Sequence, residues 1–176
     1  MILDGKKLAD TITNNLKSKI FNLHKKPTLS IILIGNNEDS LVYVNMKQKK
    51  CNKLGIKADL CHFEKDISSE KIILFVQLLN YNTSVKGIMI QLPIYFSNYR
   101  EILDTICPEK DVDGLTSYSL GKLMTIKDFD INNVNFFISS TIYGIFKLID
   151  HYNITIKGKN ITVIGNRSLV GMPLAV

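Results

Sequence analysis

The chain is poor in cysteine and arginine, and it has no long apolar run. Its three cysteines, Cys51, Cys61 and Cys107, form no Cys-x-x-Cys pair, which argues against a disulfide framework and against a zinc site. Arg100 and Arg167 are the only arginines, and aromatic residues do not alternate with basic ones, so nucleic-acid binding is disfavoured. No apolar run approaches the roughly 18–20 residues of a membrane span, and the first residues do not resemble a secretory signal. The sequence therefore indicates a globular protein of the reducing cytoplasm.

The composition favours a folded core with a basic first third. Hydrophobic residues make up 45% and charged residues 22% of the 176 residues, which is typical of one soluble domain, or of one domain and part of another. Residues 1–60 hold eleven lysines and five acidic residues, an excess equal to the whole net charge of +6. Such an excess suits an anionic ligand, although solvated helix faces are the commoner explanation of most of these lysines.

Helix and strand patterns alternate along the chain. Amphipathic spacing and cap signals predict helices at 6–23, 40–54, 68–79, 99–106 and 143–152. Nearly continuous apolar runs predict buried strands at 29–34, 57–63, 87–92 and 161–165. In the second helix, Ser40 is the predicted N-cap and Gly55 the stop signal. Strands that alternate with helices over short connections indicate an α/β fold with a parallel sheet.

Three polar features follow predicted strands, where ligands bind in open α/β sheets. Ser40 stands near a helix start, and Tyr43 and Lys47 share one face of that helix because they are four residues apart. A tyrosine hydroxyl beside a lysine amine is an acid/base pairing. Gln91 ends the third strand with both a donor and an acceptor. The same tyrosine–lysine spacing also occurs on many ordinary helix faces, so this feature alone leaves both interpretations open.

Two carboxylates precede a glycine in the segment Lys110-Asp111-Val112-Asp113-Gly114. Two carboxylates before a glycine most often belong to a solvated turn, and they also occur in calcium-binding loops. The calcium interpretation fails here because the ligand spacing is not continued.

Taken in this order, the motifs resemble the FolD family of bifunctional methylenetetrahydrofolate dehydrogenase/methenyltetrahydrofolate cyclohydrolases. The resemblance begins at Asp4-Gly5-Lys6-Lys7-Leu8-Ala9 and covers practically the whole chain. It is strongest in Ile34-Gly35-Asn36 with Ser40, Tyr43 and Lys47, in the segment 87–93, and in the segment 110–114. It implies a folate-binding catalytic domain at 1–118. It also implies that 119–176 form a linker helix and the truncated start of a Rossmann-like NAD(P)-binding domain.

The resemblance implies a role for each matching residue. Lys47 matches the catalytic lysine, Gln91 the glutamine that works with it, and Tyr43 the tyrosine stacked near the reacting pterin. Asp113 matches the aspartate that hydrogen-bonds the pterin ring, and Ser40 and Pro93 lie in the same cleft. The family oxidises methylenetetrahydrofolate to the methenyl form with NADP or NAD and hydrolyses that product to formyltetrahydrofolate. A lysine that both accepts and returns a proton would serve the hydrolysis.

The sequence departs from the family in the segments that are expected to bind the cofactor. The expected cofactor-binding residues are Thr141, Gly165, Asn166, Arg167, Ser168 and Gly171. Two prolines that flank the family's threonine are absent around Thr141, which should loosen that loop. Asn166 and Arg167 occupy the places of the family's Arg and Ser, so the sequence does not decide between NADP and NAD. Glycines before a helix start still suit a pyrophosphate.

Because the chain ends at Val176, we expect the catalytic groups to be present and the dinucleotide site to be mostly missing. Two functional hypotheses follow. The chain is the catalytic half of a homodimeric folate enzyme, or it is a non-catalytic remnant that binds folate weakly or only dimerises. A plain Rossmann-type binding module is disfavoured, since the one nucleotide motif lies at the very end.

Overall fold

The structure is a computed structural model that describes residues 2–126, 134–165 and 170–175. At its centre is a three-stranded parallel sheet in the order β2-β1-β3. The strands are β1 (Thr28–Ile34), β2 (Lys57–Phe63) and β3 (Val85–Ile90). The predicted parallel α/β fold is therefore confirmed, and the first three predicted strands agree with the observed ones to within two residues.

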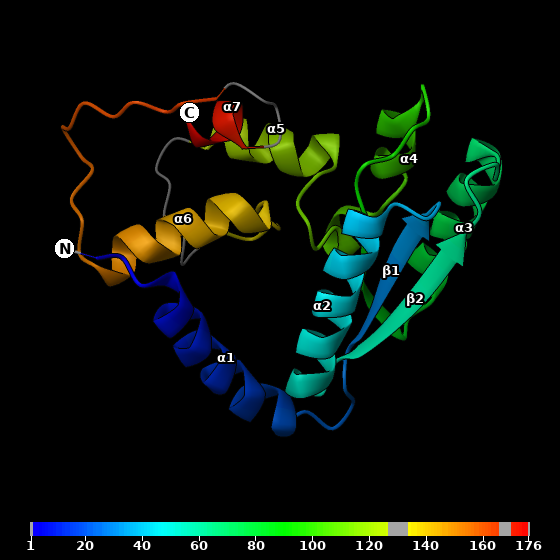
Figure 1. Cartoon of the computed structure of the whole chain (residues 1–176), viewed down its shortest axis with the longest axis horizontal. Helices are drawn as coiled ribbons and strands as arrows, with labels where there is room; N and C mark the ends of the chain where they lie inside the picture. The colour runs from blue at the N-terminus through cyan, green and yellow to red at the C-terminus, as the bar shows by residue number, and fades with distance from the viewer. Residues whose placement is uncertain (1, 127–133, 166–169, 176) are drawn as a thin grey trace.

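The order of the strands places helices on both faces of the sheet (Figure 1). α2 (Glu38–Leu54) connects β1 to β2 on one side, and α3 (Ser69–Tyr81) returns from β2 past β1 to β3. Right-handed crossovers in opposite directions lie on opposite faces. Alternate side chains of β1 show this arrangement. Ile31 and Leu33 pack with Val44 of α2 and Met89, whereas Ile32 packs with Ile72 and Val76 of α3.

The helix ends follow from local capping, with one correction. The N-cap of α2 is Asn37 and not Ser40, because the Asn37 side chain accepts a hydrogen bond from the Ser40 backbone N–H at 2.9 Å. Ser40 therefore lies inside the first turn. Gly55 ends α2 in the left-handed conformation with φ 79°, as predicted. α1 (Gly5–Phe21) is capped by Asp4, whose carboxylate accepts from the Lys7 backbone N–H.

A group of shorter elements follows the sheet. They are α4 (Tyr99–Asp104), the 3-10 helix η1 (Pro108–Lys110), α5 (Ser117–Thr125), α6 (Ser140–His151) and α7 (Gly171–Leu174). α5 was not predicted, although Thr116 caps it by accepting from the Ser119 backbone N–H. The domain boundary expected between residues 118 and 119 falls inside α5, and the two-domain division stays a prediction.

The predicted strand at 161–165 is wrong, since these residues form no strand. Ile161 is 61% and Ile164 99% exposed. A parallel strand needs neighbouring strands to satisfy its backbone groups, and in the described part of the chain no strand lies beside this segment. No helix of the described residues is long and apolar enough to span a membrane.

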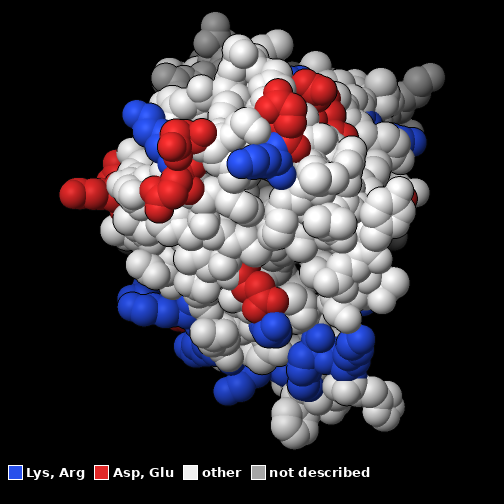
Figure 2. Space-filling model, turned by 90° about the vertical axis from the view of Figure 1, so that its right-hand side faces the viewer, with Lys and Arg blue, Asp and Glu red and all other residues white. Residues whose placement is uncertain are grey.

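The surface charge is unevenly distributed. The strands end toward the upper part of the molecule in Figure 1. On the face shown in Figure 2, which is turned about the vertical axis, the lysines gather toward the lower edge. On this face the lysines therefore gather away from the ends of the strands.

Candidate active site

Three segments meet at the carboxyl ends of β1 and β3. They are the first turns of α2, the residues directly after β3, and the loop 110–114. Gln91 follows β3, and its backbone N–H donates to the Ile32 carbonyl at 2.8 Å, so the ladder to β1 continues past the end of the strand. This bond fixes the place from which the Gln91 side chain projects.

A lysine–glutamine contact lies at this edge of the sheet. The Lys47 ammonium donates to Gln91 Oε1 at 3.1 Å. Gln91 Nε2 in turn donates to the Leu92 carbonyl at 2.9 Å, which fixes the orientation of the amide, with its oxygen toward the lysine. Lys47 is half-buried. The lysine and the glutamine that the sequence analysis selected are therefore in direct contact.

Asp113 completes a polar cluster with Lys47. Burial raises the pKa of the Asp113 carboxyl, the nearby Lys47 charge opposes this rise, and the Asp111 carboxylate adds to it. A carboxyl with a raised pKa beside a lysine is typical of functional sites, although structural charge networks also produce such shifts. The fold thus brings residues 47, 91 and 113 together from three separate segments.

Asp111, two residues earlier, has a different environment. It is 1% exposed, and its carboxylate accepts from the Leu115 and Thr116 backbone N–H groups at 3.1 and 3.0 Å. It also accepts from the Thr116 and Ser119 hydroxyls, each at 2.7 Å. All the donors lie in residues 115–119, which lead into the first turn of α5, so this carboxylate orders the turn that follows it. The sequence signal for this role is the helix cap at Thr116, and α5 was not predicted from it.

Two glycines allow the loop 110–114 to lie close to its neighbours. A Cβ at Gly87 of β3 would lie 2.5 Å from Val112 Cγ1. Gly114 has φ +62°, and a Cβ there would lie 2.7 Å from the Phe137 carbonyl oxygen and from the Ser139 backbone nitrogen. Asp113 is therefore held between the sheet and the segment that leads into α6.

The other expected substrate-binding residues surround this cluster. Tyr43 lies one turn before Lys47 and is 56% exposed, so its ring is free to contact a flat ligand. Ser40 is 4% exposed, and its hydroxyl donates to the Leu92 carbonyl at 3.4 Å, so it fastens α2 to the segment after β3. Pro93 is exposed and follows a cis peptide bond.

The expected cofactor residues lie elsewhere. Thr141 is exposed in the first turn of α6. α6 starts at Ser140, three residues earlier than predicted, so Thr141 lies in its first turn and not in a loop before the helix. Gly165 is exposed, and Gly171 is buried at the start of α7. Asn166, Arg167 and Ser168 lie outside the described residues.

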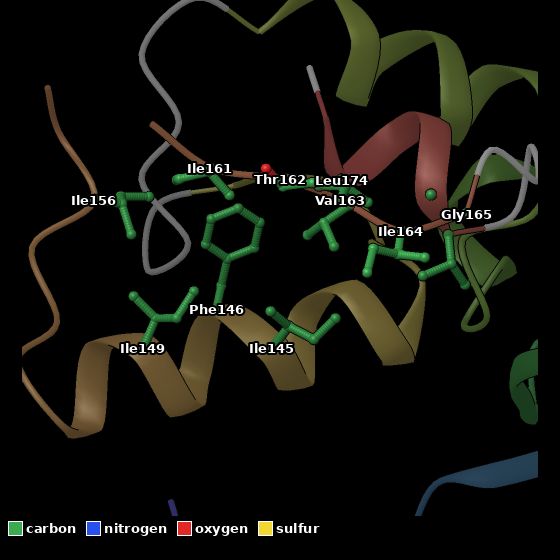
Figure 3. Close-up of a pocket in the computed structure, with 12 residues that line it drawn as sticks. Ile145, Phe146, Ile149, Ile156, Ile161, Thr162, Val163, Ile164, Gly165 and Leu174 are labelled. Carbon is green, nitrogen blue, oxygen red and sulfur yellow. The ribbon is translucent and has the colours of Figure 1, made fainter. Parts of the chain in front are cut away.

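Gly165 and Gly171 line an apolar groove of about 700 Å³ between α6 and the segment 156–165 (Figure 3). Ile145, Phe146 and Ile149 of α6 point into it, facing Ile161, Val163 and Ile164. Among the described residues that line it, Thr162 alone has a polar side chain. Its described lining residues carry no charged group and do not include Lys47, so we do not assign the chemistry to this groove.

The fold matches that of known folate enzymes. The structure aligns with the bifunctional enzyme FolD, a methylenetetrahydrofolate dehydrogenase/cyclohydrolase, from Campylobacter jejuni, with a TM-score of 0.90 and 33% identity over 99% of this chain and 61% of that one. It also aligns with the Trypanosoma brucei FolD enzyme, solved with NADP cofactor and inhibitor, with a TM-score of 0.89 and 25% identity over 99% of this chain and 59% of that one.

Sequence comparison agrees. The bifunctional protein FolD of a Hydrogenobaculum species is 40% identical over 99% of this chain and 62% of its own length. Residues 3–113 match the model of the tetrahydrofolate dehydrogenase/cyclohydrolase catalytic domain. The chain belongs to this family. It spans about 60% of the length of the relatives that it matches.

Proposed function

We propose that this chain binds a tetrahydrofolate derivative at the carboxyl ends of β1 and β3 and supplies the catalytic groups for methenyltetrahydrofolate hydrolysis. The observation that carries the proposal is the contact of Lys47 with Gln91 beside Asp113, within a domain of the folate family. Each of the three residues comes from a different segment, so chance sequence spacing does not explain their proximity.

The proposed chemistry assigns one task to each group. The methenyl carbon is electron-poor, and water adds to it through the oxygen. Lys47 in its neutral form takes the proton from this water, while Gln91 Oε1 holds the amine in place. The carbon–nitrogen bond of the five-membered ring then breaks, and the proton passes from Lys47 to the released nitrogen. As the formyl C=O forms, the second proton of the water leaves the hydroxyl oxygen for the solvent. The cationic methenyl substrate and water thus give the neutral formyl product and one released proton, and Lys47 ends in the form in which it began.

Recognition of the substrate falls to the neighbouring groups. Asp113 accepts hydrogen bonds from the amide-like edge of the pterin, since one carboxylate can accept two donors in a plane. The half-exposed ring of Tyr43 stacks on the flat substrate from the α2 side. Pro93 and Ser40 form part of the wall, with Ser40 acting through its bond to Leu92.

The dehydrogenase reaction needs NADP or NAD as hydride acceptor, and we propose NADP, the cofactor of the solved Trypanosoma brucei enzyme. The residues that would contact the cofactor are those of the predicted cofactor site, Thr141, Gly165, Asn166, Arg167, Ser168 and Gly171. The described residues do not make a dinucleotide site by themselves, because their groove has one polar side chain and no cation for a pyrophosphate.

We further propose a cytoplasmic homodimer. Three free cysteines suit a reducing compartment. Leu74, Leu78 and Tyr81 of α3 are more than half exposed, and an exposed apolar stripe of this kind is typical of an interface.

The proposal is tested by titrating the chain with a methenyltetrahydrofolate substrate and following both heat and loss of the methenyl absorbance. Lys47→Ala should lower the hydrolysis rate by roughly 10²–10⁴-fold, as for a lost general base, with folate affinity changed by less than about tenfold. Lys50→Ala is the matched control, since Lys50 is an exposed lysine of the same helix. Hydrolysis by Lys47→Ala at the wild-type rate would contradict the mechanism. Folate binding without hydrolysis by the wild-type chain would favour the non-catalytic alternative.

A further inference from the structure

The side chain of Lys110 lies at the C-terminal end of α3 and not at the polar cluster. Its ammonium donates to the carbonyls of Leu79, Asn80 and Asn82 at 2.8, 2.7 and 2.9 Å. A lysine has three donors, so all of them are used by backbone groups of one helix end. Lys110 is therefore not available to a ligand, although it begins the motif that carries Asp113.

The location is electrostatically favourable. The last carbonyls of a helix have no partner within the helix, and they carry the negative end of its dipole. α3 ends at Tyr81 without a basic residue in its last turn and without a glycine cap. The ammonium of Lys110, supplied from a distant part of the sequence, takes the place of both.

A second contact joins the same helix end to the start of the loop. The Asn80 side chain donates to the Thr105 carbonyl at 2.7 Å and accepts from the Cys107 backbone N–H at 3.1 Å. The chain from residue 105 to 110 is thus attached to α3 at both of its ends. From Lys110 onward, Asp111 forms a bridge to Ile88 of β3.

These contacts fix the origin of a very short connection. Only Asp111 and Val112 separate Lys110 from Asp113, and Val112 packs against the backbone of Gly87. A change in the position of Lys110 should therefore displace Asp113, because the two intervening residues are too few and too closely packed to absorb it. Lys47, in contrast, is positioned by α2 and by Gln91.

We propose that Lys110 is a positioning residue, which holds the loop 110–114 on the C-terminal end of α3 and thereby sets the placement of Asp113 relative to Lys47. The inference rests on the proposed function for its effect on folate binding. The proposed role differs from that of a helix cap, because loss of the ammonium should change the environment of Asp113 and not only the stability of α3.

The test uses the whole chain and compares Lys110→Met, which keeps the length of the side chain, with Lys110→Arg, which keeps the charge and the donors. The first readout is the NMR titration of the Asp113 carboxyl carbon without ligand. In Lys110→Met, the pKa of Asp113 should move toward its ordinary value as the loop opens to water. Lys47 and Asp111 are the charged groups that face Asp113. Lys110→Arg should restore most of the wild-type titration.

The second readout is the affinity for a tetrahydrofolate analogue. Lys110→Met should weaken binding about tenfold, the order expected when a charge-assisted hydrogen bond is misplaced. In the Asp113→Asn background the same change should have less than about a twofold further effect, because Lys110 acts through Asp113. Lys86→Met, at an exposed lysine of β3, should change neither readout.

The outcomes separate the two proposals. If the Asp113 titration is the same in Lys110→Met as in the wild type, the positioning role is wrong, whatever the loss of thermal stability. Additive effects in the double variant would overturn it as well. If the wild-type chain binds no folate, the proposed function fails, and the Asp113 titration still decides the role of Lys110. Should Lys110→Met not fold, Lys110→Gln, which retains at most two donors, should shift the titration by a smaller amount in the same direction.

Discussion

Asp111 and Asp113 are two residues apart, yet the structure predicts opposite consequences for their removal. Asp111 is buried and accepts four hydrogen bonds, three of them at one oxygen, Oδ2, and one at Oδ1. Asp113 accepts none from the protein among the bonds of the described residues. Removal of Asp111 should therefore act on stability, and removal of Asp113 on ligand binding.

The magnitude for Asp111 follows from its donors. In Asp111→Ala, the two N–H groups and two hydroxyls lose their acceptor in a buried site. At roughly 1 kcal/mol or more for each unsatisfied group, the free energy of unfolding should fall by at least about 4 kcal/mol, a large part of the 5–15 kcal/mol typical of a native protein. In Asp111→Asn, the amide oxygen can keep the place of Oδ2, and only the Leu115 N–H then faces an NH₂ group. This variant should lose about 1–3 kcal/mol.

The assay is thermal unfolding followed by circular dichroism. A loss of 1 kcal/mol lowers the midpoint by about 2–4 °C in a chain of this size, so Asp111→Ala should unfold roughly 8–16 °C below the wild type. Asp111→Asn should lie between them. Asp113→Ala is the control from the same loop and should change the midpoint by only a few degrees. Equal midpoints for Asp111→Ala and Asp113→Ala would refute the reasoning, because it assigns the buried hydrogen bonds to Asp111 alone.

Two further predictions concern the same loop. Because the pKa of Asp113 is raised above 3.8 in the folded state, its ionisation destabilises the fold as the pH rises from about 3.8 through the raised pKa. The free energy of unfolding of Asp113→Asn should therefore rise relative to that of the wild type across this window. Urea unfolding at a series of pH values measures both free energies. A difference between the two proteins that is independent of pH would contradict the burial of Asp113. Gly114→Ala should lower the thermal midpoint, since φ is +62° and the new methyl group would meet backbone atoms at 2.7 Å. Gly121→Ala, inside α5 with nothing within 4 Å of its Cβ, should instead raise stability by about 0.5–1 kcal/mol, so a loss in both variants would point to a general intolerance of substitution.

The sheet could be predicted from the sequence because its signals are local. The run at 29–34 is almost entirely apolar because β1 is covered by α2 and α3 on its two faces. The same kind of run at 161–165 led to a wrong prediction. Periodicity reports what a segment can bury, and it does not report whether neighbouring strands are present to pair with it. α5 was missed because its cap depends on Thr116, one of several polar residues in a row that looked like a loop.

The residues of the candidate site could likewise be predicted only in part. Lys47, Gln91 and Asp113 were identified through the resemblance, and the fold brings them together. Their catalytic and binding roles remain predictions. The contacts of Lys110 could not be predicted from the sequence, since its partners lie at the end of α3 and the contact depends on tertiary packing. Asp111 instead bonds to residues four to eight positions later, and the capping residue Thr116 was a local signal for this. Ser40 shows the limit of motif reasoning, because its position in the motif did not reveal that its hydroxyl is bonded to Leu92.

The central place of β1 also has a consequence in time. As the chain leaves the ribosome, β1 meets β2 first, with α2 packed on one face, as Thr28 pairs with Lys57. The other face, with Ile32, stays open until α3 has formed and β3 has reached its position, where Thr28 pairs with Val85. Parallel pairing over such a distance is slow, because the loop must close before the contacts form. The nascent chain thus exposes the apolar Ile32 side of β1 until α3 and β3 have been synthesised and packed, and apolar surface exposed in this way favours aggregation.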